Sequence, residues 1–464
     1  MSEPNEMYDL AVIGGGSAGY AATRTGVAAG LRTVILEGGA EVGGLCILRG
    51  CMPSKALLYA SEVLHLCRNA ATWGLRVEDA SFNFARVMAR KDAMIQEFAE
   101  YRRQQLASGK FTFLRAQARF TDPHTLELKD GQTIKARHFV IATGSVVAPP
   151  ALPALNNLGY LTSDDVLALK QLPRSLIVLG GGAVAVEMAQ FLSRFDVKVT
   201  LVQRSEHLLK EFDTDAATDL ETVFRREGIE LYTGTQLTGA RRCGNLKEIL
   251  FQHRGQTVRV AAEEILFAQG RAPNIAGLNL AAAGVSVAGG RIVTDAQMRT
   301  SAPHIFAAGD CTGPHEIVHI AIQQGEIAVH NIIQPAKPRQ SDYRLLVSVV
   351  FTEPQVAQVG LTEKAAQAQR VPYLAAKYPF NDHGKSLLME AKDGFVKLLA
   401  NPTTGEILGG TCVGPQGGEL IHEIVVAMYK RMTVHELTAV PHYHPTLAEI
   451  WTYPAEELAE QITL

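Results

Sequence analysis

Two cysteines lie five residues apart in a glycine-rich segment near the N-terminus. This segment runs Gly43-Gly44-Leu45-Cys46-Ile47-Leu48-Arg49-Gly50-Cys51-Met52-Pro53-Ser54-Lys55. On a regular helix the Cα atoms of Cys46 and Cys51 would be roughly 8–9 Å apart, which is too far for a disulfide. The glycines allow the chain to distort at a helix entrance, Pro53 suits a first helical turn, and a helix N-terminus stabilises a thiolate. Taken alone, the pair is either two structural thiols or a redox pair. Zinc is disfavoured because no second Cys/His pair has ligand spacing.

A histidine and a glutamate near the C-terminus are candidates for a catalytic base. They belong to the run His442-Tyr443-His444-Pro445-Thr446-Leu447-Ala448-Glu449. A lone histidine is more often a surface side chain or a satisfied one. Thiol–disulfide chemistry, however, needs a base tuned near neutrality to take a proton from an incoming dithiol. A carboxylate such as Glu449 would orient the ring of His444 and stabilise its imidazolium form.

Two segments that repeat each other would position these groups. Residues 9–19 and residues 175–185 each contain an apolar strand, a glycine-rich turn and the opening of a helix, which is the dinucleotide-binding fingerprint. The first glycine permits a tight turn, the second lets a pyrophosphate approach, and the third small residue lets helix and strand pack closely. The helix N-terminus favours the phosphate charge. These positions are Gly14, Gly16 and Gly19 in the first copy, and Gly180, Gly182 and Ala185 in the second.

The two copies differ where the ribose should bind. They lie 180 − 14 = 166 residues apart, and Glu37 ends the second strand of the first copy. The matching position in the second copy is Gln203, followed by Arg204, with Lys210 one or two turns further on. An acid binds a ribose diol, whereas a cation suits a 2′-phosphate. We therefore predict FAD in the first copy, and NADP or NAD in the second, with NADP favoured. Arg204 taken alone is equally well a solvated surface charge.

Length and composition exclude several classes of protein. At about 150 residues per domain, 464 residues suggest about three domains, and from about Ser341 mixed strand and helix patterns indicate a third, α+β domain. Lys+Arg minus Asp+Glu is 44 − 47 = −3, which argues against nucleic-acid and membrane-surface partners. Six cysteines are too few for a disulfide scaffold. No secretory signal or spanning helix is indicated, so we expect a soluble, cytoplasmic protein that binds no metal.

The cysteine segment resembles the active-site signature of the class I pyridine nucleotide–disulfide oxidoreductases, on the pattern Gly43-Gly44-x-Cys46-x4-Cys51-x-Pro53-Ser54-Lys55. That group includes dihydrolipoyl dehydrogenase, glutathione reductase and mercuric reductase. The resemblance extends over essentially the whole chain, through Thr300-x5-Phe306-Ala307-Ala308-Gly309-Asp310, Ala268-Gln269-Gly270-Arg271-x-Pro273-Asn274 and Phe351-Thr352-x-Pro354. It implies an α/β fold with two Rossmann-like dinucleotide-binding domains and a C-terminal α+β dimerisation domain. The expected limits are 1–150 for the FAD domain, 151–275 for the NAD(P) domain, 276–340 for a central segment completing the FAD domain, and 341–464 for the interface domain.

The same resemblance implies roles for individual residues. A dithiol would attack Cys46 of a Cys46–Cys51 redox disulfide, and the Cys51 thiolate would face the flavin. Lys55 would pair with Glu187 near the flavin, and Asp310 would contact its ribityl chain. His444 and Glu449 would come from the partner subunit, so the active site would be shared across a homodimer. The residues expected to bind the nucleotides are Gly14, Gly16, Gly19, Glu37, Gly44, Lys55, Ala142, Thr143, Gly144, Gly309, Asp310, Gly180, Gly182, Ala185, Gln203, Arg204, Lys210 and Gly270.

Details within the family point to two branches. The run Met52-Pro53-Ser54-Lys55, the pair His442/His444 and His319 resemble dihydrolipoyl dehydrogenase, whereas Gln203-Arg204, Lys210 and Ala185 resemble the NADPH-using glutathione reductase branch. We predict an enzyme that passes electrons between a small or protein-bound dithiol, most simply dihydrolipoamide, and NAD(P). The alternatives are an NADPH-dependent reductase of glutathione or another small disulfide, and a non-catalytic redox-sensing flavoprotein. Mercuric reductase is disfavoured because a C-terminal vicinal cysteine pair and an N-terminal metal-binding extension are missing.

Overall fold

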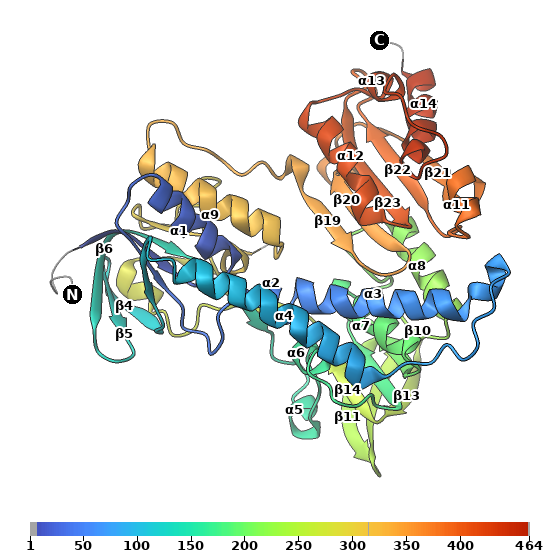
Figure 1. Ribbon diagram of the computed structural model, residues 1–464, viewed down its shortest axis with the longest axis horizontal. Coiled ribbons are helices and arrows are strands. Elements are labelled where there is room, and N and C mark those ends of the chain that lie inside the picture. The colour runs from blue at the N-terminus through green and yellow to red at the C-terminus, as the bar shows by residue number, and fades with distance from the viewer. Residues whose placement is uncertain (1–6, 314, 463–464) are drawn as a thin grey trace. The chain divides into compact units, whose positions relative to one another are not determined.

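The computed structural model describes residues 7–313 and 315–462, and the chain divides into two compact units. The first unit comprises Met1–Pro53, Ala89–Pro149 and Gly270–Ser341, and the second comprises Ser54–Met88, Pro150–Gln269 and Asp342–Leu464. Figure 1 labels many of the elements of both units. The predicted central segment, 276–340, therefore lies in the same unit as the first glycine-rich turn.

The first unit is built on a seven-stranded sheet in which β3, β2, β1, β6 and β18 run parallel and β5 and β4 add an antiparallel extension. The strands are β1 (Tyr8–Ile13), β2 (Thr33–Leu36), β3 (Thr112–Leu114), β4 (Ala118–Asp122), β5 (Thr125–Leu128), β6 (Thr133–Ile141) and β18 (Ile305–Ala307). Helices α1 (Ser17–Ala28) and α9 (Val318–Ile333) lie side by side (Figure 1). They approach closely because Gly325 has no side chain: a Cβ there would lie 2.4 Å from the carbonyl oxygen of Ala18.

The second unit contains the second nucleotide-binding motif. Its parallel sheet has the order β10-β9-β8-β14, and a three-stranded antiparallel sheet, β11-β12-β13, follows β10 in the chain. The elements are β8 (Ser175–Leu179), α7 (Ala183–Arg194), β9 (Lys198–Val202), α8 (Thr214–Arg226), β10 (Glu230–Tyr232), β11 (Gln236–Cys243), β12 (Leu246–His253), β13 (Gln256–Ala262) and β14 (Glu264–Phe267). Continuous apolar strands such as β8 are typical of a sheet covered on both faces.

The C-terminal part of the second unit is a five-stranded antiparallel sheet with helices against it. Its elements are β19 (Val347–Val350), β20 (Gln355–Gly360), β21 (Leu374–Pro379), β22 (Phe395–Ala400), β23 (Ile407–Gly414), α12 (Gly417–Tyr429) and α14 (Thr452–Gln461). The fully buried Trp451 anchors its core and donates its indole N–H to the carbonyl oxygen of Leu420 at 3.1 Å. The predicted α/β class with two Rossmann-like folds and an α+β C-terminal domain is confirmed.

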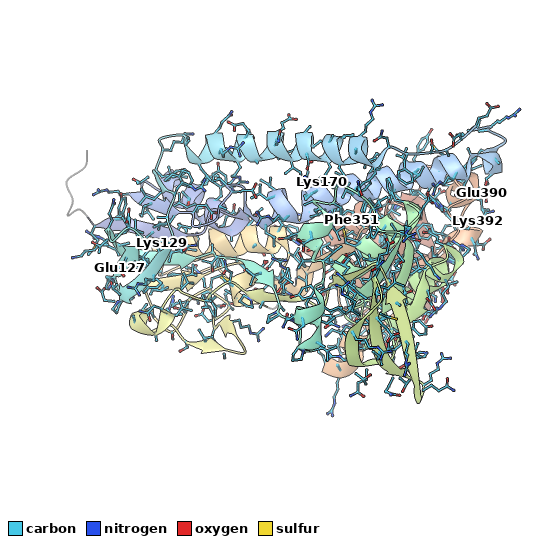
Figure 2. All side chains as sticks on the ribbon, turned by 90° about the horizontal axis from the view of Figure 1, so that it is seen from below. Glu127, Lys129, Lys170, Phe351, Glu390 and Lys392 are labelled. Atoms are coloured by element: carbon cyan, nitrogen blue, oxygen red, sulfur yellow. The ribbon has the colours of Figure 1, made fainter. Side chains whose placement is uncertain are left out.

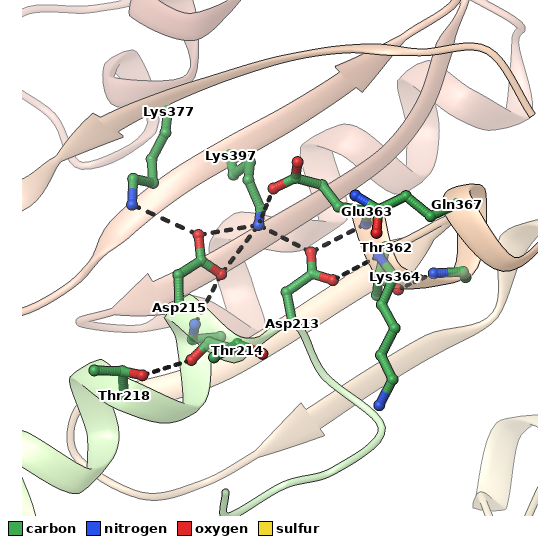
Figure 3. Close-up of polar contacts among 12 residues, drawn as sticks. Asp213, Thr214, Asp215, Thr218, Thr362, Glu363, Lys364, Gln367, Lys377 and Lys397 are labelled. Carbon is green, nitrogen blue, oxygen red and sulfur yellow. Dashed lines mark hydrogen bonds and ion pairs between the residues drawn. The ribbon is translucent and has the colours of Figure 1, made fainter.

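A buried lysine joins the two parts of the second unit (Figure 3). Lys397 of β22 is 2% exposed, and its ammonium lies 2.9 Å from Asp213 and Glu363 and 3.0 Å from Asp215. Asp213 also accepts the backbone N–H groups of Glu363 and Lys364 at the start of α10 (Glu363–Gln369). Burial opposes the charge of Lys397, yet these carboxylates raise the pKa of its ammonium above the usual range. Every charge in this cluster is paired, as buried charges require.

One local expectation needs correction. Lys210 does not follow Gln203 on a helix, because the chain runs through bends until α8 begins at Thr214. Near the C-terminus a short 3-10 turn, η6 (Ala448–Trp451), precedes α14. The remaining elements are α2 (Gly44–Arg49), α3 (Cys51–Arg68), η1 (Ala70–Trp73), α4 (Phe84–Leu106), β7 (Ser145–Val147), α5 (Ala154–Leu158), α6 (Ser163–Val166), β15 (Arg271–Pro273), η2 (Leu280–Ala283), β16 (Val287–Ala288), β17 (Arg291–Ile292), η3 (Asp310–Thr312), η4 (Tyr343–Leu345), η5 (Phe380–Asp382), α11 (Gly384–Leu388) and α13 (Val434–Thr438). Among the helices described, none has the length and apolar composition to cross a bilayer.

Candidate active site

The two cysteines stand on either side of a helix break. Cys46 lies inside α2, and Cys51 is the first residue of α3. Between them Gly50 is non-helical, and a Cβ on it would lie 3.1 Å from the carbonyl oxygen of Leu45 and 3.3 Å from the Cα of Cys46. The chain therefore folds back against Cys46, as the glycines predict. Both cysteines are partly buried.

The cysteine segment begins directly against the first glycine-rich turn. Gly44 has φ +73°, and a Cβ on it would lie 2.7 Å from the Cα of Gly16. Gly14 has φ +110°, and its Cβ would lie 2.3 Å from the carbonyl oxygen of Ala142. No side chain fits either position, so the backbone of the turn, the cysteine segment and the end of β6 are held together in the first unit.

A cavity lies beside the residue predicted to bind the ribose of FAD. The Glu37 carboxylate accepts the backbone N–H groups of Gly15 at 3.0 Å and Gly39 at 2.7 Å, which fix it at the end of β2. The cavity measures about 290 Å³ and is lined by Glu37, Gly38, Gly39, Arg115, Ala116, Gln117, Lys129 and Asp130. Figure 2 labels Lys129. A carboxylate that lines a cavity and accepts an N–H of the glycine-rich turn fits the adenosine end of FAD.

Asp310, predicted to contact the ribityl chain, is held by side chains distant in sequence. It begins η3 just after β18 and accepts the hydroxyl of Ser145 at 2.6 Å. Arg271 in turn donates to the hydroxyl and to the carbonyl oxygen of Ser145, each at 2.8 Å. The backbone N–H of Gly309 donates to Gln324 at 2.7 Å. Sequence reasoning missed Ser145 and Gln324 as members of this site, although Ser145 directly follows the predicted Ala142-Thr143-Gly144.

The second glycine-rich turn has the same backbone but different side chains. A Cβ on Gly182 would meet nothing within 4 Å, so space is open for a pyrophosphate in front of α7. Gln203 lies against this turn, since a Cβ on Gly181 would be 2.8 Å from its side chain, and its amide oxygen accepts the N–H of Arg204 at 3.0 Å. Arg204 is exposed. Lys210 is exposed as well, and its ammonium lies 3.4 Å from Glu211.

The predicted Lys55–Glu187 pair is formed in the second unit. The ammonium of Lys55 lies 2.8 Å and 3.0 Å from the two carboxylate oxygens of Glu187, which is 3% exposed. The backbone N–H of Phe351 donates to the same carboxylate at 3.0 Å, and the ammonium lies 4.6 Å from the centre of the Phe351 ring. Lys55 follows Cys51 by four residues in α3. The carboxylate thus fixes the direction of a cation that belongs to the helix of the second cysteine.

The predicted His444–Glu449 pair is also formed. Nδ1 of His444 lies 3.0 Å from Oε2 of Glu449; the histidine side chain is 78% exposed, and the glutamate is buried. His442 pairs separately with Glu423 at 2.6 Å. The second oxygen of Glu449 faces His383, a fully buried histidine that sequence reasoning did not select. Because Nδ1 of His444 faces the carboxylate, its Nε2 is left to accept a proton from a ligand.

Two family models together match most of the chain. The pyridine nucleotide-disulphide oxidoreductase model matches residues 8–325, and the pyridine nucleotide-disulphide oxidoreductase dimerisation domain matches residues 346–455.

Individual proteins match over nearly the full length. The dihydrolipoyl dehydrogenase of Chlamydia trachomatis is 34% identical over 461 residues, with 97% of each chain covered. A mercuric reductase of Staphylococcus aureus is 32% identical over 444 residues, which cover 95% of this chain and 81% of that protein. Among solved structures, the HOCl-induced flavoprotein disulfide reductase RclA of Escherichia coli is 25% identical, with a TM-score of 0.86, covering 97% of this chain and 99% of that one.

Proposed function

This chain belongs to the pyridine nucleotide-disulphide oxidoreductase family, and we propose that it oxidises a dithiol of the dihydrolipoyl class with NADP as electron acceptor. As a member of that family it is an FAD-dependent oxidoreductase that uses a nicotinamide nucleotide, and its dimerisation domain makes it a homodimer. The substrate, the nucleotide preference, the predicted domain limits and the role of each site residue are parts of the proposal.

The His444–Glu449 pair is the observation that carries the dithiol assignment. An exposed imidazole held at 3.0 Å by a buried carboxylate is oriented and available to an incoming substrate. The carboxylate also stabilises the imidazolium that forms when the ring takes a proton. A protein that only sensed redox state would need the cysteines without such a base.

In the proposed reaction one sulfur of the dithiol attacks Cys46 while His444 takes its proton. The Cys46–Cys51 bond breaks, and Cys51 leaves as a thiolate at the N-terminus of α3, where the helix end stabilises negative charge. The second thiol of the substrate then displaces Cys46, so the substrate becomes a disulfide and the cysteines hold its two electrons. Bound FAD supplies the carrier that passes the electron pair to the nicotinamide. Lys55 and Glu187 would stand beside it, and the base pair would come from the partner subunit, as in the family.

The preference for NADP rests on the second nucleotide site. Gln203 carries no charge where Glu37 carries one, and the exposed Arg204 follows it directly. A neutral amide beside a guanidinium accepts a 2′-phosphate that a carboxylate would repel.

The neutral Gln203 and the exposed Arg204 also favour a second candidate function, that of an NADPH-dependent reductase of a small disulfide. It would use the same cysteines in the opposite direction, with His444 returning its proton to the leaving thiolate. The likeness to a solved flavoprotein disulfide reductase supports this direction.

An anaerobic absorption spectrum tests both candidates. Dihydrolipoamide is added to the oxidised, FAD-loaded enzyme before any nucleotide, and a long-wavelength band from a thiolate beside the flavin is expected. NADP⁺ should then discharge the band faster than NAD⁺. Cys51→Ser is expected to give no band, and His444→Gln to give it slowly. If dihydrolipoamide gives no band and NADPH does, the lipoyl assignment is wrong, and small disulfides such as glutathione disulfide become the leading substrates.

A further inference from the structure

A second histidine lies behind the proposed base pair. His383, between η5 and α11, is 0% exposed, and its Nε2 lies 3.4 Å from Oε1 of Glu449. The other oxygen of that carboxylate, Oε2, faces His444 at 3.0 Å. Glu449 is therefore placed between two imidazoles, one exposed and one enclosed. None of the roles predicted for the site residues involves His383.

The surroundings of His383 fix its tautomer. Its Nδ1 lies 2.8 Å from the hydroxyl of Ser386, which is also 0% exposed. A buried hydroxyl needs an acceptor for its proton, and Nδ1 supplies one. The ring proton then resides on Nε2, the nitrogen that faces the Glu449 carboxylate. The opposite tautomer would aim a lone pair at a buried anion, which is unfavourable.

The ring is also kept neutral by its enclosure. Burial lowers the pKa of His383, and this effect exceeds the opposing attraction of Glu449. Besides Ser386, the groups that face it are Glu449 and the backbone of Thr446, with His444 beyond them. On the remaining side the ring of Tyr453 lies 6.3 Å away, stacked on Tyr378 at 4.0 Å. His383 therefore serves as a fixed hydrogen-bond donor rather than as a second base.

We propose that His383 is a positioning residue for the reaction: through its Nε2–H it holds one oxygen of Glu449, so that the other oxygen stays aligned with His444. Ser386 completes the chain by fixing the tautomer of His383. The inference rests on the proposed role of His444 as base. The observed 3.4 Å contact is long for a hydrogen bond, and Nε2 of His383 has no closer acceptor among the residues that the structure describes.

The test compares two substitutions of His383, by glutamine and by asparagine, whose side-chain amide nitrogens lie at different distances from the backbone. The amide nitrogen of His383→Gln lies near the place of Nε2, whereas that of His383→Asn lies near the place of Nδ1 and does not reach Glu449. Each FAD-loaded variant is mixed anaerobically with dithiothreitol, a small dithiol that does not depend on the natural substrate. The rate at which the long-wavelength thiolate–flavin band forms is recorded against pH. Flavin reduction by NADPH and thermal unfolding are measured on the same samples.

We expect His383→Gln to keep the wild-type pH profile. We expect His383→Asn to slow band formation about 10-fold and to move the acid limb of the profile to lower pH by roughly 0.5 unit. The limb moves down because an imidazolium facing a poorly aligned carboxylate loses its proton more easily. Glu449→Gln should move it in the same direction and further. Flavin reduction by NADPH should stay unchanged in every His383 variant.

Equal profiles in the two amide variants and the wild type would overturn the inference. If either His383 variant does not fold, Ser386→Ala is measured instead. Loss of the hydroxyl that fixes the His383 tautomer should shift the acid limb in the same direction by a smaller amount. An unshifted pH profile in Ser386→Ala would contradict the inference. Failure of the proposed function is recognised separately. In that case His444→Gln leaves the wild-type rate and profile unchanged, whatever the His383 variants do.

Discussion

The two glycine-rich turns of this protein have the same backbone and different charges. Gly14 has φ +110° and Gly180 has φ +125°, and a Cβ on either would lie 2.3 Å from the carbonyl oxygen of Ala142 or of Ala268. In each unit the first glycine is thus required by a neighbouring strand end. The same glycine-rich turn is present twice, with nearly the same backbone geometry.

The side chains around the two turns differ in size and charge. A Cβ on Gly19 would lie 1.8 Å from the carbonyl oxygen of Gly14, whereas the second copy carries Ala185, fully buried, at the same position. Helix α1 therefore approaches its turn more closely than a methyl group allows, and α7 does not. Glu37 is held by two backbone N–H groups, and its counterpart Gln203 contacts the backbone of Arg204. The shape of the turn is duplicated, and under the proposed function one side chain, Glu37 or Gln203, would decide which nucleotide binds.

The largest effect is expected when the first glycine of each turn is substituted, because each substitution should abolish the binding of a different cofactor. Gly14→Ala places a methyl group against the Ala142 carbonyl at a positive φ, at a cost of about 3 kcal/mol or more, and it should yield colourless protein without FAD. Gly180→Ala makes the same change in the second copy. It should stay yellow but lose nicotinamide nucleotide binding, seen as a KM raised beyond measurement. Gly384→Ala, in open space, is the control. Two yellow proteins with equal nucleotide KM values would refute the assignment of the copies.

The next-largest effect is expected when a negative charge is introduced at Gln203 of the second site. Gln203→Glu recreates the acid of the first copy, so repulsion of a 2′-phosphate should lower kcat/KM for NADPH by roughly 100-fold relative to NADH. Gln203→Ala removes the amide without adding charge and should change the ratio little. Steady-state rates with both nucleotides measure it. An unchanged ratio in Gln203→Glu would mean that the 2′-position lies elsewhere.

The reciprocal substitution, at Glu37 of the first site, should have a smaller effect. Glu37→Gln keeps the length of the side chain but removes the charge that accepts ribose hydroxyls, and it should weaken FAD binding roughly 10-fold. Fluorescence titration of the flavin-free protein with FAD measures the change. The variant Glu41→Gln alters an exposed carboxylate nearby and serves as the control. A dissociation constant equal to that of the wild type would place the ribose away from Glu37.

The last effect, seen only at high pH, concerns Cys311, a fully buried thiol of the first unit. Burial raises the pKa of Cys311 to about 11, and its Sγ donates to the carbonyl oxygens of Ile141 and Ala308. Since the unfolded thiol loses its proton near pH 9, the folded state should lose stability as pH rises from about 9 to 11, by about 2 kcal/mol at pH 10.5. Thermal unfolding at pH 8 and pH 10.5 measures this loss. Cys311→Ala should reduce the loss, and an identical loss in both proteins would contradict the assignment.

Features of short range in the sequence predicted the corresponding structure well. The strand–turn–helix copies, the acid at the end of β2 and the break between Cys46 and Cys51 are each encoded within about thirty residues. Their causes are local: apolar alternation, glycine conformations and the entry of a helix. The Lys55–Glu187 pair was accessible only through resemblance to a family, because it spans 132 positions and nothing in either local segment identifies the partner. Glu449, in contrast, lies five positions from His444 and is a candidate partner from the local run alone.

The sequence by itself determined the fold class, the two strand–turn–helix copies and the position of the cysteine pair, because their patterns are periodic and local. Only the tertiary structure decided that Ser145 and Arg271 hold Asp310, that Lys397 joins two parts of one unit, and that His383 lies behind Glu449. Each of these contacts connects elements far apart in the chain. Before folding, such side chains look like any other polar residue, and burial is what gives each of them defined partners.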